Sequence, residues 1–277
     1  MQVRKPAVSG IFYPGDKESL LSSIKECFLH KYGPKSLPPS KDRKEIISVI
    51  VPHAAYIYSG PIAANSYYYI SSLKPELIVL IGPNHYGIGS GVATMKGVWE
   101  TPLGSIEVDD EAVDIVVKES GIVDIDFYAH SKDHCLEVQL PMLQFVYAHK
   151  FKILPIVLWM QDRETAEDIG KALAEVAKLK NTLLIASSDF THYEPNEIAH
   201  KKDKELIKCI EELDLLKYYT VLERLDVTAC GYGAMASVIY ASKLLGASKG
   251  ELIRYATSGD ISGNKDSVVG YASMMIV

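Results

Sequence analysis

The sequence has no apolar run that approaches the roughly 20 residues needed to cross a bilayer as a helix. Its first residues, MQVRKPAVSG, contain no long hydrophobic stretch, so they do not resemble a secretory signal. The 4 cysteines form no CxxC pair and no disulfide framework spacing. We therefore expect a cytoplasmic protein with reduced thiols and no membrane partner.

An excess of basic residues is also missing. Lys and Arg together number 29, against 35 Asp and Glu, which gives a net charge of -6. A nucleic-acid-binding protein needs a basic face, so this balance argues against a nucleic-acid partner. No repeat of roughly 20–50 residues is recognisable. Asn and Gln are scarce whereas Lys and Glu are abundant, which favours a thermophilic source.

What the chain does contain is a regular alternation of apolar runs and helical patterns over 277 residues. Such alternation favours an α/β fold, and we predict a mainly parallel central sheet flanked by helices on both faces, in a single domain over residues 1–277. The predicted strands cover 46–51, 77–81, 151–160 and 182–188, with a C-terminal hairpin of 251–260 and 267–277. The predicted helices cover 17–30, 61–72, 110–119, 136–149, 164–179 and 197–225, and a last helix follows Cys230 and ends at Leu245. Residues 33–44 are predicted to be a surface connection, and 87–108 to form strands or loops over the sheet edge.

Three of the predicted strands end near a histidine that stands among turn residues. His53 follows IISVIV, His85 follows LIVLIG, and His192 follows TLLIA within SSDFTHYEP. Ligands of open α/β sheets bind beyond the carboxyl ends of the strands. Because the chain has only 8 histidines, we predict that these three share one site.

His53 and His85 are about one βαβ unit apart, so adjacent parallel strands would bring their imidazoles together. The tight turn Gly82-Pro83-Asn84 strengthens the case for His85. For His53 alone, a core histidine that is hydrogen-bonded to a neighbouring carbonyl is an equally good interpretation.

Cys230 lies just before a helical pattern, in the segment TACG. A helix N-terminus lowers the pKa of a thiol, and the thiolate is the form that binds metals. Gly231 and Gly233 indicate a close approach of the backbone to another segment; the alternative is a small, buried, apolar cysteine. Together with His53 and His85, Cys230 would provide an N/N/S donor set. Such donors suit Fe(II), Cu(I) or zinc and do not suit magnesium or calcium.

Two further pairs have spacing that favours a role in the same site. Asp189 and His192 share one loop, where a carboxylate can orient an imidazole and make it a general base. The alternative for His192 is packing against Tyr193. His134 and Glu137 have i, i+3 spacing and would share a helix face behind the ligands. An ordinary helix N-terminal turn explains the same spacing.

The segments AVSGIFYP, VPHAAYIYSG, IGPNHYG, DHCLEVQLPMLQ, SSDFTHYEP and ACGYG resemble the Memo family. They occur in the family's order and at compatible spacing, from about Val3 to the C-terminus. The Memo family shares its α/β fold with the class III, non-haem-iron extradiol dioxygenases. The resemblance implies that the metal ligands are His53, His85 and Cys230. It also implies that Asp189 and His192 form a catalytic pair, and that Phe12 and Tyr56 bind the substrate.

Three functions remain open. The first is a metal-dependent redox or oxygen-using enzyme, with Fe(II) or Cu(I) held by the N/N/S donors and protons moved by His192. The second is a phosphopeptide-binding or protein-interaction module that uses the same pocket, as animal relatives in the family are described to do. The third is a Cys–His hydrolase built on Cys230 and His192, for which no nucleophile motif is present. The expected partner is thus a small molecule or a peptide.

Overall fold

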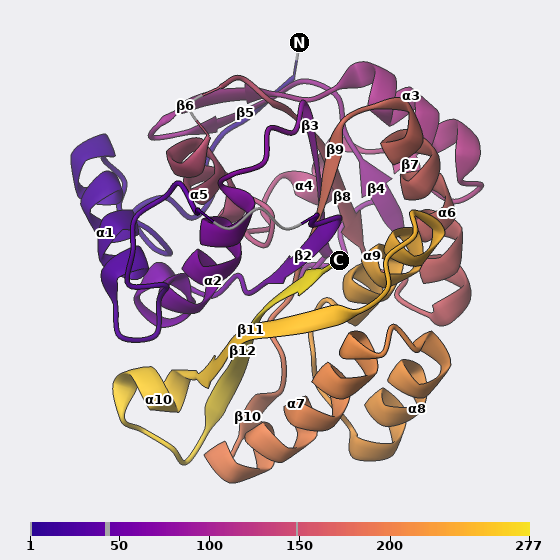
Figure 1. The fold of residues 1–277 in the computed structure, drawn as a ribbon. Coiled ribbons are helices and arrows are strands. Elements are labelled where there is room, and N and C mark those ends of the chain that lie inside the picture. Colours follow the sequence, from indigo (N-terminus) through magenta and orange to yellow (C-terminus); the bar gives the residue numbers. More distant parts are fainter. Residues whose placement is uncertain (1, 42–44, 148) are drawn as a thin grey trace.

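The computed structural model describes residues 2–41, 45–147 and 149–277. Within these residues a nine-stranded sheet has the order β10-β12-β2-β9-β3-β8-β4-β7, with β11 paired to β12 (Figure 1). Its strands are β2 (Ser48–Val51), β3 (Leu77–Pro83), β4 (Val92–Thr94), β7 (Asp124–Ile125), β8 (Lys152–Leu158), β9 (Thr182–Ser187), β10 (His192–Glu194), β11 (Gly250–Thr257) and β12 (Val268–Ile276). A separate small sheet contains β1 (Val3–Arg4), β5 (Val98–Thr101) and β6 (Gly104–Glu107).

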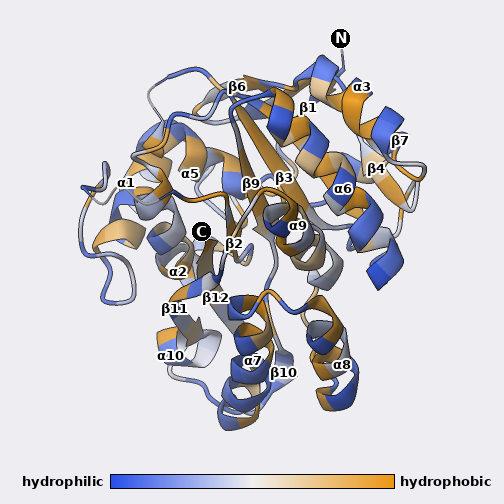
Figure 2. Ribbon diagram, turned by 45° about the vertical axis from the view of Figure 1, so that its right-hand side comes forward, coloured by the Kyte–Doolittle hydropathy of each residue, from blue (hydrophilic) through white to orange (hydrophobic). Residues whose placement is uncertain are grey.

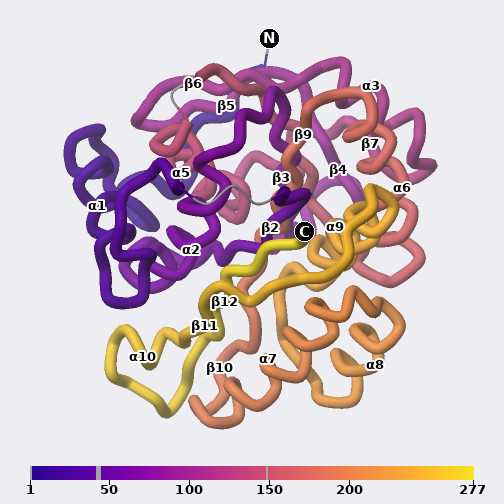
Figure 3. Tube along the Cα trace, in the orientation of Figure 1, coloured from indigo at the N-terminus to yellow at the C-terminus, as the bar shows by residue number. Residues whose placement is uncertain are grey.

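Helices cover the central sheet on both faces, as predicted (Figures 1 and 3). One layer consists of α1 (Lys17–Leu29), α2 (Tyr56–Ile70) and α5 (Gln139–Val146), and the other of α3 (Asp110–Glu119), α6 (Arg163–Leu179) and α9 (Tyr232–Leu244). The helix α7 (Asn196–Glu211) packs against β11 and β12, and α8 (Leu215–Leu225) packs against α7. Two short helices are α4 (Phe127–His130) and α10 (Ser258–Ser262). Among the described residues, no helix is long and apolar enough to cross a membrane.

The central strands are apolar along their whole length, because helices cover both of their faces. All residues of β2 and β3 are buried, and β3 and β9 are almost uniformly hydrophobic in Figure 2. The covering helices are amphipathic: α6 buries eight residues, such as Ile169 and Leu173, and turns its charged residues to solvent. One cluster of buried side chains extends from Val8 to Ile276.

The sheet is mixed: its centre is parallel, as predicted, and it also has antiparallel pairs. The strands β2, β9, β3 and β8 are parallel to one another, whereas β12 runs antiparallel to β2 and β4 runs antiparallel to β8. The predicted C-terminal hairpin is confirmed, since β11 pairs antiparallel with β12. The antiparallel pairing of β12 with β2 was not predicted, because a strand that is buried on both faces is apolar whatever the direction of its neighbours.

Two helices begin at other residues than predicted. The helix predicted over 61–72 begins five residues earlier, at Tyr56, so Pro61 lies inside α2. The helix predicted over 136–149 is reduced to α5, because residues 135–138 form turns and residue 148 lies outside the described residues. The predicted surface connection 33–44 likewise includes residues 42–44, which the structure does not describe.

Candidate metal centre

The register of three neighbouring strands brings the candidate ligands to one sheet edge. In the pairing of β2 with β9, Val51 lies opposite Ser187, and in that of β3 with β9, Ile81 lies opposite Ala186. The sequence had led us to expect that β2 and β3 are adjacent. They are not, because β9 lies between them. His53 and His85 nevertheless meet above the end of β9, with ring centroids 5.1 Å apart.

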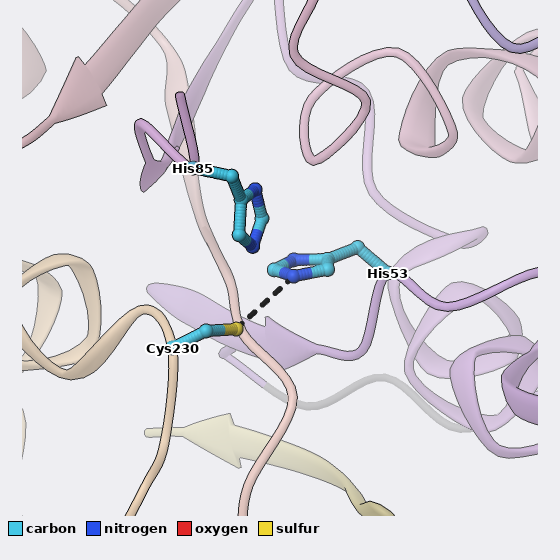
Figure 4. A group of neighbouring side chains, drawn as sticks. All are labelled: His53, His85 and Cys230. Carbon is cyan, nitrogen blue, oxygen red and sulfur yellow. Dashed lines mark hydrogen bonds between the residues drawn. The ribbon is translucent and has the colours of Figure 1, made fainter. Parts of the chain in front are cut away.

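His53, His85 and Cys230 form one group that could hold a metal ion, and the name metal centre hereafter denotes these three residues. One ligand atom from each lies within 4.8 Å of the other two, and in Figure 4 the three side chains converge from separate segments of the chain. The Sγ atom of Cys230 is 3.1 Å from Nε2 of His53. Solvent reaches the centre from one side, because His53 is buried, Cys230 is half-buried and His85 is exposed.

The hydrogen bonds of Ser187 define which nitrogen of His53 is free. Its hydroxyl donates to the Cys135 carbonyl at 2.7 Å, so its single proton is used. The contact of 2.9 Å between Ser187 Oγ and His53 Nδ1 therefore requires a proton on Nδ1. The Nε2 atom of His53 then carries a free lone pair and faces Cys230. Burial lowers the pKa of His53 well below its usual range, which keeps the imidazole neutral.

Asp133 orients His85 in the corresponding way. Its Oδ1 atom lies 3.1 Å from Nδ1 of His85, and its Oδ2 atom accepts the His85 backbone N–H at 2.6 Å. Burial alone would raise the pKa of the Asp133 carboxyl, but the hydrogen bonds from His85 and from the Cys135 backbone outweigh it and hold this pKa well below its usual range. An ionised carboxylate that accepts the Nδ1 proton leaves the lone pair of Nε2 available to a metal ion, an arrangement common behind metal-binding histidines.

Glycine allows the Cys230 segment to reach the end of β9. A Cβ atom on Gly231 would lie 2.6 Å from the Ser187 carbonyl oxygen, and one on Gly233 would lie 2.7 Å from the Gln161 side chain. The close approach predicted from these glycines is confirmed. The lowered thiol pKa is not: burial and the neighbouring Asp189 raise the pKa of Cys230, although its Sγ atom accepts the Asp189 backbone N–H. In the metal-free protein the group is a thiol.

A third imidazole lies against the centre. The ring of His134 stacks on that of His85, with centroids 4.6 Å apart and an interplanar angle of 14°, and it lies 5.3 Å from the ring of His53. Burial lowers the pKa of His134 to about 3, so this ring is also neutral. Phe12 covers its other side at 4.6 Å. His134 and Phe12 thus form part of the wall of the site.

Glu137 and Tyr56 have structural contacts that differ from the roles expected for them. Glu137 is fully buried, pairs with Arg4 and accepts the backbone N–H groups of Ala7 and Val8. It fixes the N-terminal segment that carries Phe12, and it shares no helix face with His134, because α5 begins only at Gln139. Tyr56 is buried, and its hydroxyl donates to the Val138 carbonyl at 2.7 Å, so its ring packs against the turn that precedes α5.

His192 is held by Thr228 rather than by Asp189. Its backbone N–H donates to Thr228 Oγ1 at 2.7 Å, and its Nδ1 atom lies 2.8 Å from the Thr228 carbonyl, which leaves Nε2 unprotonated. Its ring also packs edge-on against Tyr193, at 5.7 Å. Asp189 instead accepts the backbone N–H of His53 at 2.8 Å, and burial raises the pKa of its carboxyl.

A second group of candidate ligands shares His85 with the metal centre. It adds Asp133 and Cys135, but these atoms already have partners. The Cys135 thiol lies 3.1 Å from the Pro83 carbonyl, and burial raises its pKa well above the usual range. The carboxylate of Asp133 is engaged by His85. We therefore infer that Asp133 and Cys135 position the metal centre and do not form a second metal site.

Four residues in the site were not singled out from the sequence. Asp133 orients His85, and Ser187 fixes the proton of His53. Thr228 holds His192, and Gln161 donates to the Cys230 carbonyl at 2.9 Å. Ser187 had a recognisable signal, since a polar residue closes an otherwise apolar strand. Thr228 and Gln161 act through pairs of hydrogen bonds that involve backbone atoms of distant segments, and no residue pattern distinguishes such contacts.

Comparison with known proteins agrees with the resemblance seen in the motifs. Residues 4–275 match the family model described as "Memo-like protein". Curated relatives include a MEMO1 family protein of Nitrosopumilus maritimus, 53% identical and covering 99% of this chain and 100% of its own length. A MEMO1 family protein of Methanopyrus kandleri is 47% identical, with 98% of each chain covered. Among solved structures, an uncharacterised protein of Escherichia coli K12 has the same fold, with a TM-score of 0.58 at 14% identity, over 83% of this chain and 99% of its own.

Proposed function

This chain belongs to the Memo family, and from that premise we propose that it binds a single iron(II) or reduced copper ion through His53, His85 and Cys230. The observation that carries the proposal is that three potential ligand atoms, two Nε2 atoms and one sulfur, are available at the same place. Ser187 and Asp133 each engage the Nδ1 atom of one histidine, so both rings present Nε2 beside the Cys230 sulfur. A purely structural role for these residues would not require that both imidazoles have Nδ1 engaged and Nε2 free.

The donor set selects the kind of metal. Two neutral imidazoles and one thiolate are soft to intermediate donors, which favour Cu(I), Fe(II) or zinc over magnesium and calcium. Three protein ligands would leave a coordination position open, and the exposure of His85 supports access to it from solvent. We favour Fe(II) or Cu(I) over zinc, because the related extradiol dioxygenases are redox enzymes.

We infer that the site performs redox or oxygen-dependent chemistry on a substrate not yet identified. An iron or copper ion held by His53, His85 and Cys230 would supply one-electron redox chemistry, with the electrons drawn from the substrate and O2 as the oxidant. His192 supports this reading, since the Thr228 carbonyl engages its Nδ1 proton and Nε2 is free to accept one from a substrate. His134 and Phe12 limit the access of water on one side.

The charges near the centre weigh against the alternative of phosphopeptide binding. Phosphate groups are recognised by cations, above all by arginine. Burial keeps His53 and His134 neutral, and the carboxylate of Asp133 lies within hydrogen-bonding distance of His85. A phosphoryl group of charge about -2 would be repelled by this carboxylate and would meet no fixed positive charge in the centre.

The test is the metal content of untagged protein after anaerobic reconstitution with Fe(II) or Cu(I). We expect one ion per chain in the natural protein and less than about a tenth of that occupancy in Cys230→Ala, at ion concentrations near the dissociation constant. Cys209→Ala is the matched control, because Cys209 is buried in α7, its thiol donates to the helix carbonyl of Glu205, and it is not among the grouped ligands of the described structure. Equal metal content in Cys230→Ala and Cys209→Ala would reject the proposal.

A further inference from the structure

Large apolar side chains are exposed beside the metal centre. Tyr86 and Ile88 follow His85 on the loop after β3, and Trp159 and Met160 follow the end of β8. Their exposed fractions are 55%, 38%, 61% and 44%, respectively. Scattered single apolar residues on a surface need no explanation, but a contiguous group marks a binding surface. These four residues are hereafter the apolar rim.

Contacts between the two loops make the rim continuous. The ring of Trp159 covers Gly87, where a Cβ atom would lie 3.2 Å from it, and the sulfur of Met160 is similarly close to Gly91. The backbone N–H of Trp159 donates to the Gly91 carbonyl at 2.8 Å. Trp159 is thus held against the loop that carries His85, with much of its ring exposed.

The same loop joins the rim to the other side of the metal centre. Gln161 follows Met160, and its side chain donates to the Cys230 carbonyl and accepts the Gly233 backbone N–H at 2.8 Å. Residues 159–161 therefore lie between the segments that supply His85 and Cys230. The strand β8 provides no metal ligand, but its end provides the neighbouring surface.

Charge is sparse in the segments around the centre, where the carboxylates of Asp133 and Asp189 accept the backbone N–H groups of His85 and His53. Residues 9–15, 52–73, 82–95, 153–161 and 227–234 contain no Asp, Glu, Lys or Arg, in a chain with 23% charged residues. The opposite sheet edge differs: a surface pocket of about 740 Å³ there is lined by charged residues such as Glu107 and Lys152. Sites for organic ligands combine apolar walls with a few polar groups. The edge with the metal centre has this composition.

We propose that the apolar rim binds the aromatic or aliphatic body of an uncharged organic molecule whose polar end lies at the metal centre. This inference rests on the proposed metal site for the position of the polar end. It goes beyond that proposal in assigning the substrate class and in naming Trp159 as a specificity-determining residue. Trp159 offers the largest exposed aromatic face of the rim, and the uncharged loops favour a neutral ligand over an anion.

The experiment compares 2-naphthol with 2-naphthyl phosphate, which share an aromatic body and differ in charge. Binding is measured by equilibrium dialysis under anaerobic conditions, for metal-loaded and for metal-free protein. Emission from Trp159 provides a second readout, since the other tryptophan, Trp99, is buried. We expect 2-naphthol to bind about tenfold more tightly than the phosphate, and Trp159→Ala to weaken 2-naphthol binding about tenfold. Trp159→Phe should retain most of the affinity.

Leu179→Ala is the matched control, because Leu179 is 69% exposed at the end of α6, next to the start of β9. It should not change naphthol binding, and Trp159→Ala should retain its full metal content. Equal naphthol affinity in Trp159→Ala and the natural protein, in either metal state, would overturn the inference, as would tighter binding of the phosphate. A natural protein without metal would instead refute the proposed metal function, while the metal-free measurements still test the rim.

Two other occupants would also overturn the inference. If the rim joins two copies of the chain, the natural protein will sediment as a dimer and Trp159→Ala as a monomer. If it contacts a lipid surface, the natural protein will co-sediment with neutral phosphatidylcholine vesicles and Trp159→Ala will not. We expect neither result, and sedimentation of both proteins unchanged by this substitution supports the small-molecule assignment.

Discussion

The carboxylate of Asp133 holds both the ring and the backbone of His85. One oxygen lies 3.1 Å from Nδ1, and the other accepts the backbone N–H at 2.6 Å. Because the two contacts are made by one rigid group, the direction of Nε2 is fixed relative to the loop. The Ser187 hydroxyl orients His53 through Nδ1 alone. Asp133 therefore contributes more to the preorganisation of the centre than its place behind the ligands suggests.

Asp133→Asn should weaken metal binding about 10–100-fold, because an amide is a poorer acceptor for Nδ1–H and makes His85 a weaker donor. Competition with a chelator of known affinity measures the change. Asp126→Asn is the control: Asp126 also accepts backbone N–H groups, from Ser90 and Tyr128, but it contacts no histidine ring. If both variants lose affinity equally, orientation of His85 is not the cause.

Metal binding should release a proton from Cys230. Burial raises the pKa of this thiol above its usual range, so it is protonated at neutral pH in the metal-free protein, and the thiolate that binds must lose that proton. His53 is already neutral, since burial lowers its pKa, and contributes no proton. Affinity should therefore rise with pH, by about one logarithmic unit per pH unit from this group.

Calorimetry in buffers of different ionisation enthalpy counts the protons released. The difference between the natural protein and Cys230→Ser should be about one proton per metal ion at pH 7. The serine hydroxyl stays protonated, so the variant isolates the thiol from all other groups. An equal proton count in the two proteins would mean that the sulfur is not a ligand.

Much of the fold was predictable because its signals are local. The amphipathic pattern of α6 and the long apolar run of β8 placed these elements within a residue or two. Strand order is not local: β9 lies between β2 and β3 although 130 residues separate it from β2 and 98 from β3 in the chain. The antiparallel pairings of β12 with β2 and of β4 with β8 were missed for the same reason, since a buried apolar run does not encode its neighbour's direction.

The candidate ligands were predictable from the sequence because strand ends gather at one edge, whatever the strand order. The behaviour of Cys230 was not. A position before a helix predicts a lowered thiol pKa, but burial and Asp189 have the larger effect in the folded chain. The pairing of Glu137 with Arg4, far apart in the sequence, was equally invisible to spacing arguments.

Glu137→Gln should lower the free energy of unfolding by about 3–5 kcal/mol, because it leaves the buried guanidinium of Arg4 without its countercharge. Denaturant titration measures the loss. Lys5→Met is the control, since Lys5 is 77% exposed and its pair with Glu100 should contribute at most about 1 kcal/mol. Similar losses in the two variants would show that the buried pair does not fix the N-terminal segment.

His192→Ala should keep the metal and lose activity. His192 is not among the three grouped ligands, so metal content should equal that of the natural protein. If Nε2 acts as a general base, oxygen uptake by the iron-loaded protein with a reductant should fall about 10²–10⁴-fold. Tyr193→Ala tests the packing alternative, because it removes the neighbouring ring and leaves the imidazole. Loss of melting temperature with unchanged uptake in His192→Ala would support packing instead.

Gly231→Ala should impair metal binding by moving Cys230. The added methyl group would lie 2.6 Å from the Ser187 carbonyl oxygen and 2.9 Å from Ser188 Cβ, both on the rigid end of β9. Because β9 is held on both sides by neighbouring strands, the segment between α8 and α9 that carries Cys230 has to move instead. The sulfur then moves with it. We expect metal affinity to fall by at least about tenfold, because metal–ligand bonds tolerate only about 0.2 Å of deviation. Gly121→Ala is the control, as a Cβ atom there meets nothing within 4 Å. Unchanged affinity in Gly231→Ala, with a folded protein by circular dichroism, would mean that the position of the sulfur does not determine metal binding.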